Sequence, residues 1–291
     1  MRLSTGEKIF NVVNITILSM VALTAIYPFI YVLASSLSAW QPVTAGAVFL
    51  WPLGEDFRLG VSLAAYERVF QRTDIWIGYA NSIFYSVVGT AVNLAMTALA
   101  AYPLSKSRLR GRGIVTFMIA FTMWFAAGMI PFFLTLRGYG MLNTRTVLIF
   151  AFALAAFNIF ILRTNFQNVP DSLEESAKID GANDFTILTK LYLPLSLPAL
   201  ATIGLFYFVG RWNAFFWSMI LLTDDALIPL PVILNHLLVQ ADWGGMDVDA
   251  PVRAETLIHS TIVVSILPIM MAFPVLQKYF TKGMMIGSVK G

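Results

Sequence analysis

Long apolar segments constrain the fold of this chain more than any other feature. A transmembrane helix needs about 20 predominantly apolar residues to cross a hydrocarbon core about 30 Å thick. Several stretches have that character, because 58% of the 291 residues are hydrophobic and only 12% are charged. We therefore predict an all-α polytopic membrane protein in which residues 1–291 form a single transmembrane domain. About six spans are expected, at residues 9–37, 77–104, 114–136, 147–162, 197–222 and 258–276.

The positive charges favour one orientation in the membrane. Loops on the cytoplasmic side are enriched in Lys and Arg. The loop at residues 105–113 has no acid and carries four bases, Lys106, Arg108, Arg110 and Arg112. With both termini in the cytoplasm, twelve of the nineteen Lys and Arg residues lie on the cytoplasmic side, and residues 224–255 form an acidic outer loop. We attribute the four bases to this topology and to attraction by anionic lipids, with contact to a partner protein secondary.

Residues 165–196 form a polar segment between two apolar ones, and they carry dense signals for helix ends. Ser172 followed by Glu175 three residues later is a capping-box pattern, which predicts the start of a helix. Gly181 predicts its end, and Asn183 or the next residue can cap a second helix. The predicted orientation places this segment in the cytoplasm. From these residues alone, a plain helical hairpin explains it better than a docking site does.

Several catalytic and ligand-binding motifs are missing from the sequence. There is no Gly-x4-Gly-Lys-Ser/Thr phosphate loop, so a process driven by ATP needs a separate ATPase chain. There is also no His-Glu-x-x-His or Gly-x-Ser-x-Gly motif, no cysteine, and only two histidines. We therefore expect no enzymatic activity, no catalytic residue, and no bound cofactor or metal. The net charge of +3 gives no indication of nucleic-acid binding.

Within the polar segment, the residues Glu175-Ser176-Ala177, then Gly181, then Leu191-Tyr192-Leu193-Pro194 resemble the EAA loop of bacterial ABC importer permeases. That loop is usually written Glu-Ala-Ala, three residues, Gly, nine residues, Ile-x-Leu-Pro. The spacing agrees, while Ser176 and Leu191 depart from the pattern by small changes in volume.

The resemblance extends beyond this loop. Residues 208–217, Phe-Val-Gly-Arg-Trp-Asn-Ala-Phe-Phe-Trp, are similar to the Trp-Asn-x-Phe signature of carbohydrate importer permeases of the maltose-transporter class. Residues 128–131 and 140–144 resemble an LplC-like subgroup of the same class. The resemblance therefore covers essentially the whole chain.

This resemblance implies an ABC importer permease fold in the bacterial cytoplasmic (inner) membrane. It implies alternating access that moves a carbohydrate, either an oligosaccharide or a sugar derivative. A coupling helix at residues 173–179 would sit in a cleft of a cytoplasmic ATPase and move with it. The residues assigned to this coupling are Leu173, Glu174, Glu175, Ser176, Ala177, Asp180, Gly181 and Pro194. The implied partners are a second, similar permease, two ATPase subunits that bind the ATP, an extracytoplasmic solute-binding protein and membrane lipid.

Arg211 is the one charge deep inside a predicted span. A lone Arg that faces lipid is costly, so its side chain should face a water-filled cavity, a partner subunit or an acid. Sugars bind through aromatic rings combined with hydrogen-bonding groups, and such residues follow Arg211. We therefore assign Arg211, Trp212, Asn213 and Phe215 to a substrate path. Outward snorkelling of Arg211, with Trp212 in an interfacial belt, explains the same residues equally well.

Three other classes of function stay open from the sequence. An ion-coupled secondary transporter or channel is the first alternative, and it would favour acids buried in the spans, where none is evident. A membrane-embedded enzyme or scaffold would want paired carboxylates or a His–acid set at the bilayer surface. An exporter subunit would lack the spacing of the polar loop. The permease of an importer is therefore the preferred interpretation.

Overall fold

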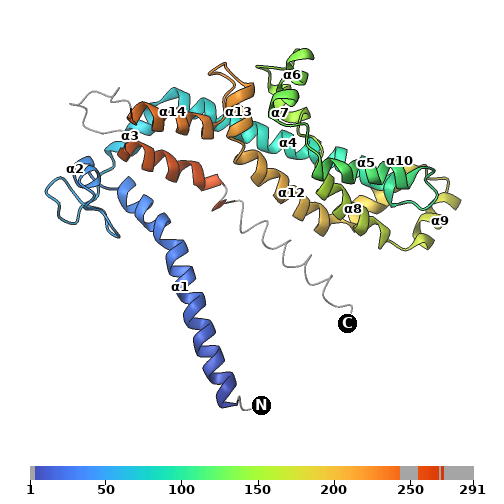
Figure 1. Cartoon of the computed structure of the whole chain (residues 1–291), viewed down its shortest axis with the longest axis horizontal. Coiled ribbons are helices and arrows are strands. Elements are labelled where there is room, and N and C mark those ends of the chain that lie inside the picture. Colours follow the sequence, from blue (N-terminus) through green and yellow to red (C-terminus); the bar gives the residue numbers. More distant parts are fainter. Residues whose placement is uncertain (1–3, 243–254, 269, 272–291) are drawn as a thin grey trace. The chain divides into compact units, whose positions relative to one another are not determined.

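The computed structural model describes residues 4–242, 255–268 and 270–271, and the regular elements within these ranges are all helices (Figure 1). This confirms the predicted all-α fold. The chain divides into two compact units. One comprises residues 1–76 and 233–267, and the other comprises residues 77–232 and 268–291.

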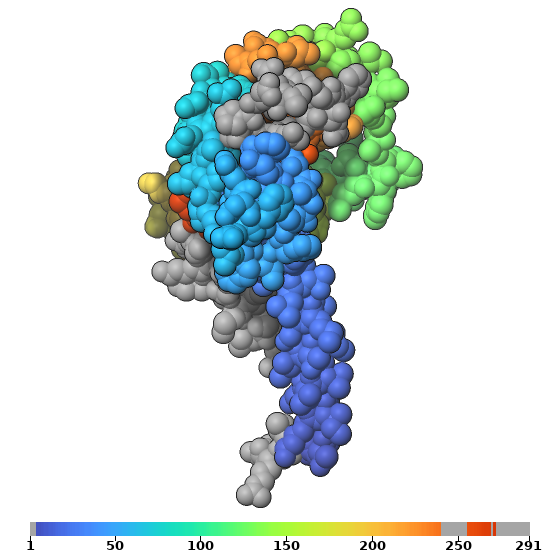
Figure 2. Space-filling view, turned by 90° about the vertical axis from the view of Figure 1, so that its left-hand side faces the viewer, coloured from blue at the N-terminus to red at the C-terminus, as the bar shows by residue number. Residues whose placement is uncertain are grey.

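The first unit begins with the long helix α1 (Thr5–Ser36). Ser4 and Glu7 form a capping box, in which the backbone N–H of Glu7 donates to Ser4 Oγ at 3.3 Å and that of Ser4 donates to Glu7 Oε2 at 2.6 Å. Most of the apolar side chains of α1 are exposed, and Figure 2 shows the helix as a dark blue column. Such a surface suits contact with lipid or with another membrane subunit.

The same unit contains α2 (Trp40–Thr44), α3 (Ala64–Gln71) and the helix Glu255–Pro268. The hydroxyl of Ser36 is hydrogen-bonded to that of Tyr66 at 2.8 Å. Ser260 Oγ donates to the backbone carbonyl of Ser36 at 3.2 Å. These two bonds hold the end of α1 against α3 and against the helix that begins at residue 255.

The second unit carries the remaining helices. The first of them are α4 (Thr73–Ser105), whose first turn belongs to the first unit, α5 (Arg112–Trp124), α6 (Met129–Gly138), α7 (Arg145–Phe150), α8 (Ala156–Gln167) and α9 (Asp171–Ile179). The later ones are α10 (Asp184–Ile187), the π-helix η1 (Leu188–Tyr192), α11 (Leu193–Leu195), α12 (Leu197–Trp212) and α13 (Phe216–Leu221), and α14 (Leu230–Asp242) begins in this unit. Its core packs α4, α8, η1 and α12 together, with Ala101, Phe166, Tyr192 and Ile203 almost fully buried.

Two helices, α1 and α4, are long and apolar enough to cross a membrane by themselves. The number rises to four if each of two bent helix pairs counts as one span. These pairs are α5 with α6, bent by 117°, and residues 184–195 with α12, bent by 85°. This count covers the described residues only, so the six-span topology and the cytoplasmic placement of both termini stay predictions.

Two of the segments that we predicted as spans contain a break between two helices. Within residues 114–136, α5 ends at Trp124 and α6 begins after Gly128, whose φ of 80° is readily adopted only by glycine. Within residues 147–162, α7 ends at Phe150 and α8 begins at Ala156. Hydropathy does not reveal either break, because the residues on both sides are equally apolar.

Two further predictions need correction. The expected span at residues 197–222 is interrupted between α12 and α13, with Asn213 as the C-cap of α12. The expected loop at residues 224–255 contains the apolar helix α14, because its acids cluster at the two ends of that segment and leave an apolar run between them. The last expected span begins within the helix Glu255–Pro268, and its residues 269 and 272–276 lie outside the described part of the chain.

Candidate functional site

The polar segment at residues 165–196 folds as the predicted helix–turn–helix, and α9 ends at its glycine. Gly181 has a φ of 80° and its N–H donates to the carbonyl of Lys178 at 3.0 Å. The N–H of Ala182 donates to the carbonyl of Ala177 at 2.9 Å. This pair of bonds is a Schellman motif, which satisfies carbonyls left free at the helix end. The predicted glycine stop is therefore confirmed.

The predicted start of α9 is only partly right. The capping box of Ser172 and Glu175 is wrong, because the helix already begins at Asp171 and Pro170 is its N-cap without a side-chain hydrogen bond. The fixed φ of proline suits entry into a helix, and the N-cap lies two residues earlier than the capping box predicts. The second helix, α10, is capped as predicted by Asn183, whose Oδ1 accepts the N–H of Thr186 at 2.8 Å.

Glu174 on α9 lies at the centre of a cluster of charges and is only 5% exposed. Arg108 Nη1 donates to Glu174 Oε1 at 2.8 Å, and Lys178 Nζ donates to the same oxygen at 2.5 Å. The Tyr192 hydroxyl donates to Oε2 at 2.8 Å. Lys106 Nζ contacts both Oε2 of Glu174 and the hydroxyl of Tyr192. We call these five residues the Glu174 cluster, and it joins α9 to the loop after α4 and to η1.

The electrostatics of the cluster favour an ionised Glu174. Burial by itself would raise the pKa of this carboxyl, but hydrogen bonds from Lys106, Lys178 and Tyr192 outweigh burial and lower the pKa to about 2. Burial also lowers the pKa of Lys106, against the opposing effect of Glu174. Arg108 Nη2 extends the cluster to α10 by donating to Asp184 Oδ1 at 2.8 Å. Both short helices are thus held to one basic loop.

This arrangement corrects our interpretation of the basic loop at residues 105–113. We attributed its four bases to topology and lipid, yet Lys106 and Arg108 are the counter-ions of the polar segment. Arg110 is exposed and Arg112 is half-buried. The sequence held a usable signal, since four bases without an acid in one loop accompany five acids, at 171, 174, 175, 180 and 184, in another.

The residues assigned to coupling divide into two groups. Five of them are exposed on the outside of the α9–α10 turn, namely Leu173, Glu175, Ser176, Asp180 and Gly181, and Pro194 is exposed on α11. Ala177 is half-buried and Glu174 is buried in its cluster. Two large apolar side chains that sequence reasoning missed, Ile179 at 86% and Phe185 at 66%, are also exposed here. Their exposure depends on helix ends that hydropathy alone does not locate.

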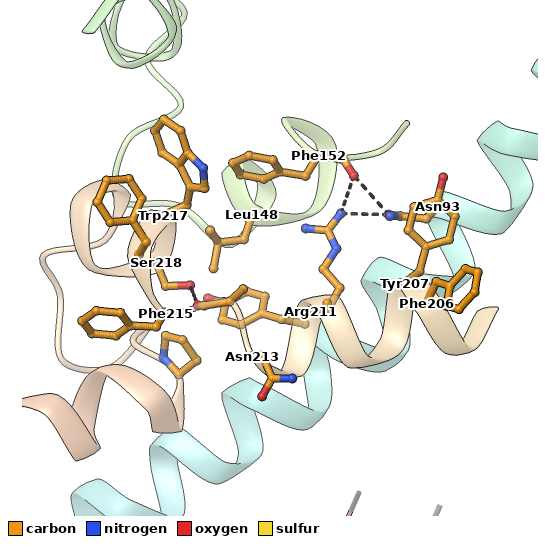
Figure 3. A pocket seen from close by; sticks show the side chains of 15 residues that line it. Asn93, Leu148, Phe152, Phe206, Tyr207, Arg211, Asn213, Phe215, Trp217 and Ser218 are labelled. Carbon is orange, nitrogen blue, oxygen red and sulfur yellow. Dashed lines mark hydrogen bonds between the residues drawn. The ribbon is translucent and has the colours of Figure 1, made fainter. Parts of the chain in front are cut away.

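Arg211 lies at the break between α7 and α8. Its Nη2 donates to Asn93 Oδ1 at 2.8 Å and to the backbone carbonyl of Phe152 at 3.0 Å (Figure 3). It also donates to the backbone carbonyl of Ile149 at 3.0 Å. Asn93 Nδ2 donates to the same Phe152 carbonyl at 3.2 Å. A helix break inside a membrane leaves carbonyls that need donors, and these two side chains supply them. Gly89 on α4 leaves room for the guanidinium, since a Cβ at that position would lie 3.1 Å from Arg211 Nε.

At the other end of the break, Tyr207 of α12 provides a hydrogen-bond acceptor for a backbone N–H at the start of α8. Its hydroxyl accepts the N–H of Ala155, the N-cap of α8, at 3.2 Å and is hydrogen-bonded to Thr97 Oγ1 at 2.8 Å. The alternative in which Arg211 snorkels outward is therefore wrong, since its guanidinium is held inside the unit. Side chains from α4 and α12 together stabilise the break.

A cavity of about 340 Å³ lies beside Arg211 within the second unit. Arg211, Asn213 and Phe215 line it, so three of the four residues assigned to a substrate path meet at one place (Figure 3). Trp212 is not among the lining residues. It is buried and packs edge-on against Tyr79, with ring centroids 6.0 Å apart. Sequence reasoning missed the lining residues from other elements, among them Asn93, Leu148, Phe152, Phe206 and Trp217.

The fold and these two sites define a class of protein: a helical membrane permease with a polar loop that is internally braced, and without a phosphate loop of its own. Residues 94–286 match the family described as the inner membrane component of binding-protein-dependent transport systems. The chain belongs to this family. It is therefore a transport permease and not an enzyme, as we expected.

Individual relatives agree with this assignment. The polygalacturonan/rhamnogalacturonan transport system permease protein YtcP of Bacillus subtilis (strain 168) is 40% identical over 290 residues, which are 98% of this chain and 99% of that protein. Protein LplC of the same organism is 38% identical over 288 residues, 98% of this chain and 96% of that one. A chain of a bacterial ABC transporter involved in the import of the acidic polysaccharide alginate has a TM-score of 0.89 and 43% identity, over 96% of this chain and 99% of its own. The resemblance to carbohydrate importer permeases is confirmed.

Proposed function

We propose that this chain is the subunit through which an ABC importer carries an oligosaccharide or sugar derivative across the cytoplasmic membrane. The substrates named for YtcP and for the alginate importer support a carbohydrate. ATP supplies the energy. The chain has no phosphate loop of its own, so two partner ATPases hydrolyse the ATP. A second, similar permease completes the path, and an extracytoplasmic solute-binding protein delivers the substrate.

The observation that carries this proposal is the way in which α9 is held. Glu174 ties one side of the helix to the basic loop, while Leu173, Ser176 and Ile179 on other sides are exposed. Exposed apolar side chains on a polar loop mark a surface for a partner. Ion pairs at Glu174 fix the buried side of α9. A partner that binds the exposed side can therefore move the loop without unfolding it.

A displacement of α9 has two routes into the core of the second unit. Lys106 and Arg108 follow directly after α4, so their bonds to Glu174 connect α9 to that helix. Tyr192, at the end of η1, connects the same carboxylate to the segment that leads into α12. Closure of the ATPases therefore moves α4 and α12 together, which switches the permease between inward-facing and outward-facing states.

The test is ATP-driven uptake of an oligosaccharide by the complete importer in proteoliposomes. Glu175→Lys reverses an exposed charge on α9, and Gly181→Pro removes the N–H that donates to Lys178 and forbids a φ of 80°. We expect both variants to abolish uptake while inserting into the membrane normally. Glu175→Gln keeps the shape of the side chain, and as the matched control it should retain more uptake than Glu175→Lys.

Two results would contradict the proposal. Normal uptake by both Glu175→Lys and Gly181→Pro would remove the coupling role of α9. Uptake that continues without the ATPase subunits and follows an ion gradient would instead identify an ion-coupled transporter.

A further inference from the structure

The cavity beside Arg211 combines a positive charge with aromatic walls and with no opposing acid. Among the described residues, Arg211 forms no salt bridge, and none of the residues that line the cavity is Asp or Glu. An ionised side chain taken out of water is costly unless it is paired. Carbonyl and amide oxygens solvate the guanidinium in part, but they do not neutralise its charge.

The three nitrogens of the guanidinium have different surroundings. Nη2 makes all three hydrogen bonds of the side chain, to Asn93, Ile149 and Phe152. Nε faces Gly89, where there is no side chain. Nη1 has no hydrogen-bond partner within the described part of the chain, and Figure 3 shows the guanidinium at the edge of the cavity, between Asn93 and Leu148. One charged donor group is therefore left for a ligand.

The rest of the cavity suits one part of a sugar chain. Phe206, Phe215, Phe216 and Trp217 supply aromatic surface, and Asn213 supplies an exposed amide. Aromatic rings pack against the C–H faces of sugars, and an amide both donates to and accepts from hydroxyl groups. At about 340 Å³ the cavity is near the lower end of the range for small-ligand sites, about 300–1,000 Å³, so it accommodates a short segment rather than a long chain.

We propose that this cavity is a subsite for an acidic sugar ring, in which Arg211 Nη1 binds the carboxylate of a uronate and the aromatic side chains contact the ring. A guanidinium and a carboxylate form one of the strongest hydrogen-bonded pairs in proteins. The ligand thus supplies the negative charge that the second unit lacks at this point. The assignment rests on the proposed function, and it deepens that function by naming the chemical class of substrate.

The competing explanation is that Arg211 only satisfies the carbonyls at the α7–α8 break. The two roles predict different results for a pair of ligands that differ in charge alone. The probes are trigalacturonate and its carboxyl-reduced, neutral counterpart. Binding of each is titrated by saturation-transfer NMR to the assembled permease–ATPase complex in phosphatidylcholine nanodiscs. For Arg211→Gln we expect affinity for the acidic probe to fall at least about tenfold, the usual loss for a hydrogen bond to a charged group, with little change for the neutral probe.

Two variants make the test independent of whether Arg211→Gln assembles. Asn93→Asp keeps an oxygen on Nη2 but places an internal carboxylate beside the guanidinium, so it should weaken binding of the acidic probe alone. Arg145→Gln removes an equal charge from a residue outside the cavity that bonds Asn81 at 3.3 Å, and it should leave the affinities for both probes unchanged.

The result that overturns the inference is equal loss, or no loss, for the two probes in both Arg211→Gln and Asn93→Asp. Competition of phosphatidylglycerol with trigalacturonate would also overturn it, by showing that a lipid phosphate occupies the cavity. Neither outcome would contradict the proposed function of carbohydrate import, because ATP-driven uptake of an oligosaccharide is measured in a separate assay.

Discussion

Replacement of Glu174 by Gln tests how firmly the α9–α10 loop is attached to the rest of the second unit. The substitution keeps the size of the side chain but removes the only negative charge within the Glu174 cluster. Lys106, whose side chain is 12% exposed, then stays close to Lys178 and Arg108 without a buried counter-ion. We expect α9 to separate locally from the basic loop while the core beneath it stays folded.

The size of this effect follows from the pKa of the carboxyl. That pKa is held at about 2 instead of the ordinary 4.5. At 1.36 kcal/mol for each pKa unit, the difference corresponds to about 3 kcal/mol of stabilisation of the ionised form. Breaking a buried ion pair by removal of one partner costs about 3–5 kcal/mol, which agrees. The free energy of local opening should therefore fall by about 3 kcal/mol in Glu174→Gln.

Hydrogen exchange of the amides at residues 171–192, followed by mass spectrometry on the purified complex, measures this opening. Glu175→Gln is the matched control, because it removes an equal charge from an exposed neighbour and should change the free energy by less than about 0.5 kcal/mol. The free energy of local opening should fall less in the double variant Glu174→Gln, Lys106→Met than the sum of the decreases in the two single variants, since neither member of this ion pair is then left as an unpaired charge. Additive losses, or unchanged exchange in Glu174→Gln, would refute the reasoning.

Two other predictions concern the same unit. The lowered pKa of Glu174 means that its stabilisation is complete above about pH 4.5 and is lost as the pH falls from about 4.5 towards 2, so the protection factors of the amides at residues 171–192, which are corrected for the intrinsic exchange rate at each pH, should fall in this window in the wild type and not in Glu174→Gln. Asn143 has a φ of 55° and its Oδ1 accepts the N–H groups of Thr223 and Asp224 at 3.0 and 2.9 Å, so Asn143→Ala should lower the unfolding free energy by about 1–3 kcal/mol. Asn143→Gly removes the backbone strain at a φ of 55° but does not restore the lost hydrogen bonds, so it should recover part of this loss. Equal melting temperatures of the two variants would contradict the contribution of the backbone.

Local signals predicted the polar loop well. Gly181 and Asn183 act through bonds within a few residues, so the chain there encodes its turn without help from distant segments. The capping box failed because Ser172 and Glu175 fit the pattern equally well inside a helix. Pro170, one residue before Asp171, was the stronger determinant of where α9 begins.

The helix breaks were not predictable in the same way. Residues 151–155 contain neither Gly nor Pro, and the break between α7 and α8 is stabilised by donors and acceptors on α4 and α12. Hydropathy measures how apolar a segment is, and it carries no information on where carbonyls find distant partners. The pairing of the basic loop with Glu174 was not predicted for the same reason. Lys106 lies 68 positions before Glu174 in the sequence, and Arg108 lies 66 positions before it.

The π-helix η1 makes the segment between the polar loop and α12 unequally sensitive to insertions and deletions. A π-helical turn holds one residue more than an α-helical turn, so loss of a single codon from residues 188–192 would convert it to an ordinary turn and leave the chain beyond it in the same orientation. Each residue of an α-helix advances by about 100°, so a single-residue insertion, which the π-helix cannot absorb in this way, would rotate the chain beyond it by about that angle. Single-residue deletions at this point should therefore be tolerated better than single-residue insertions.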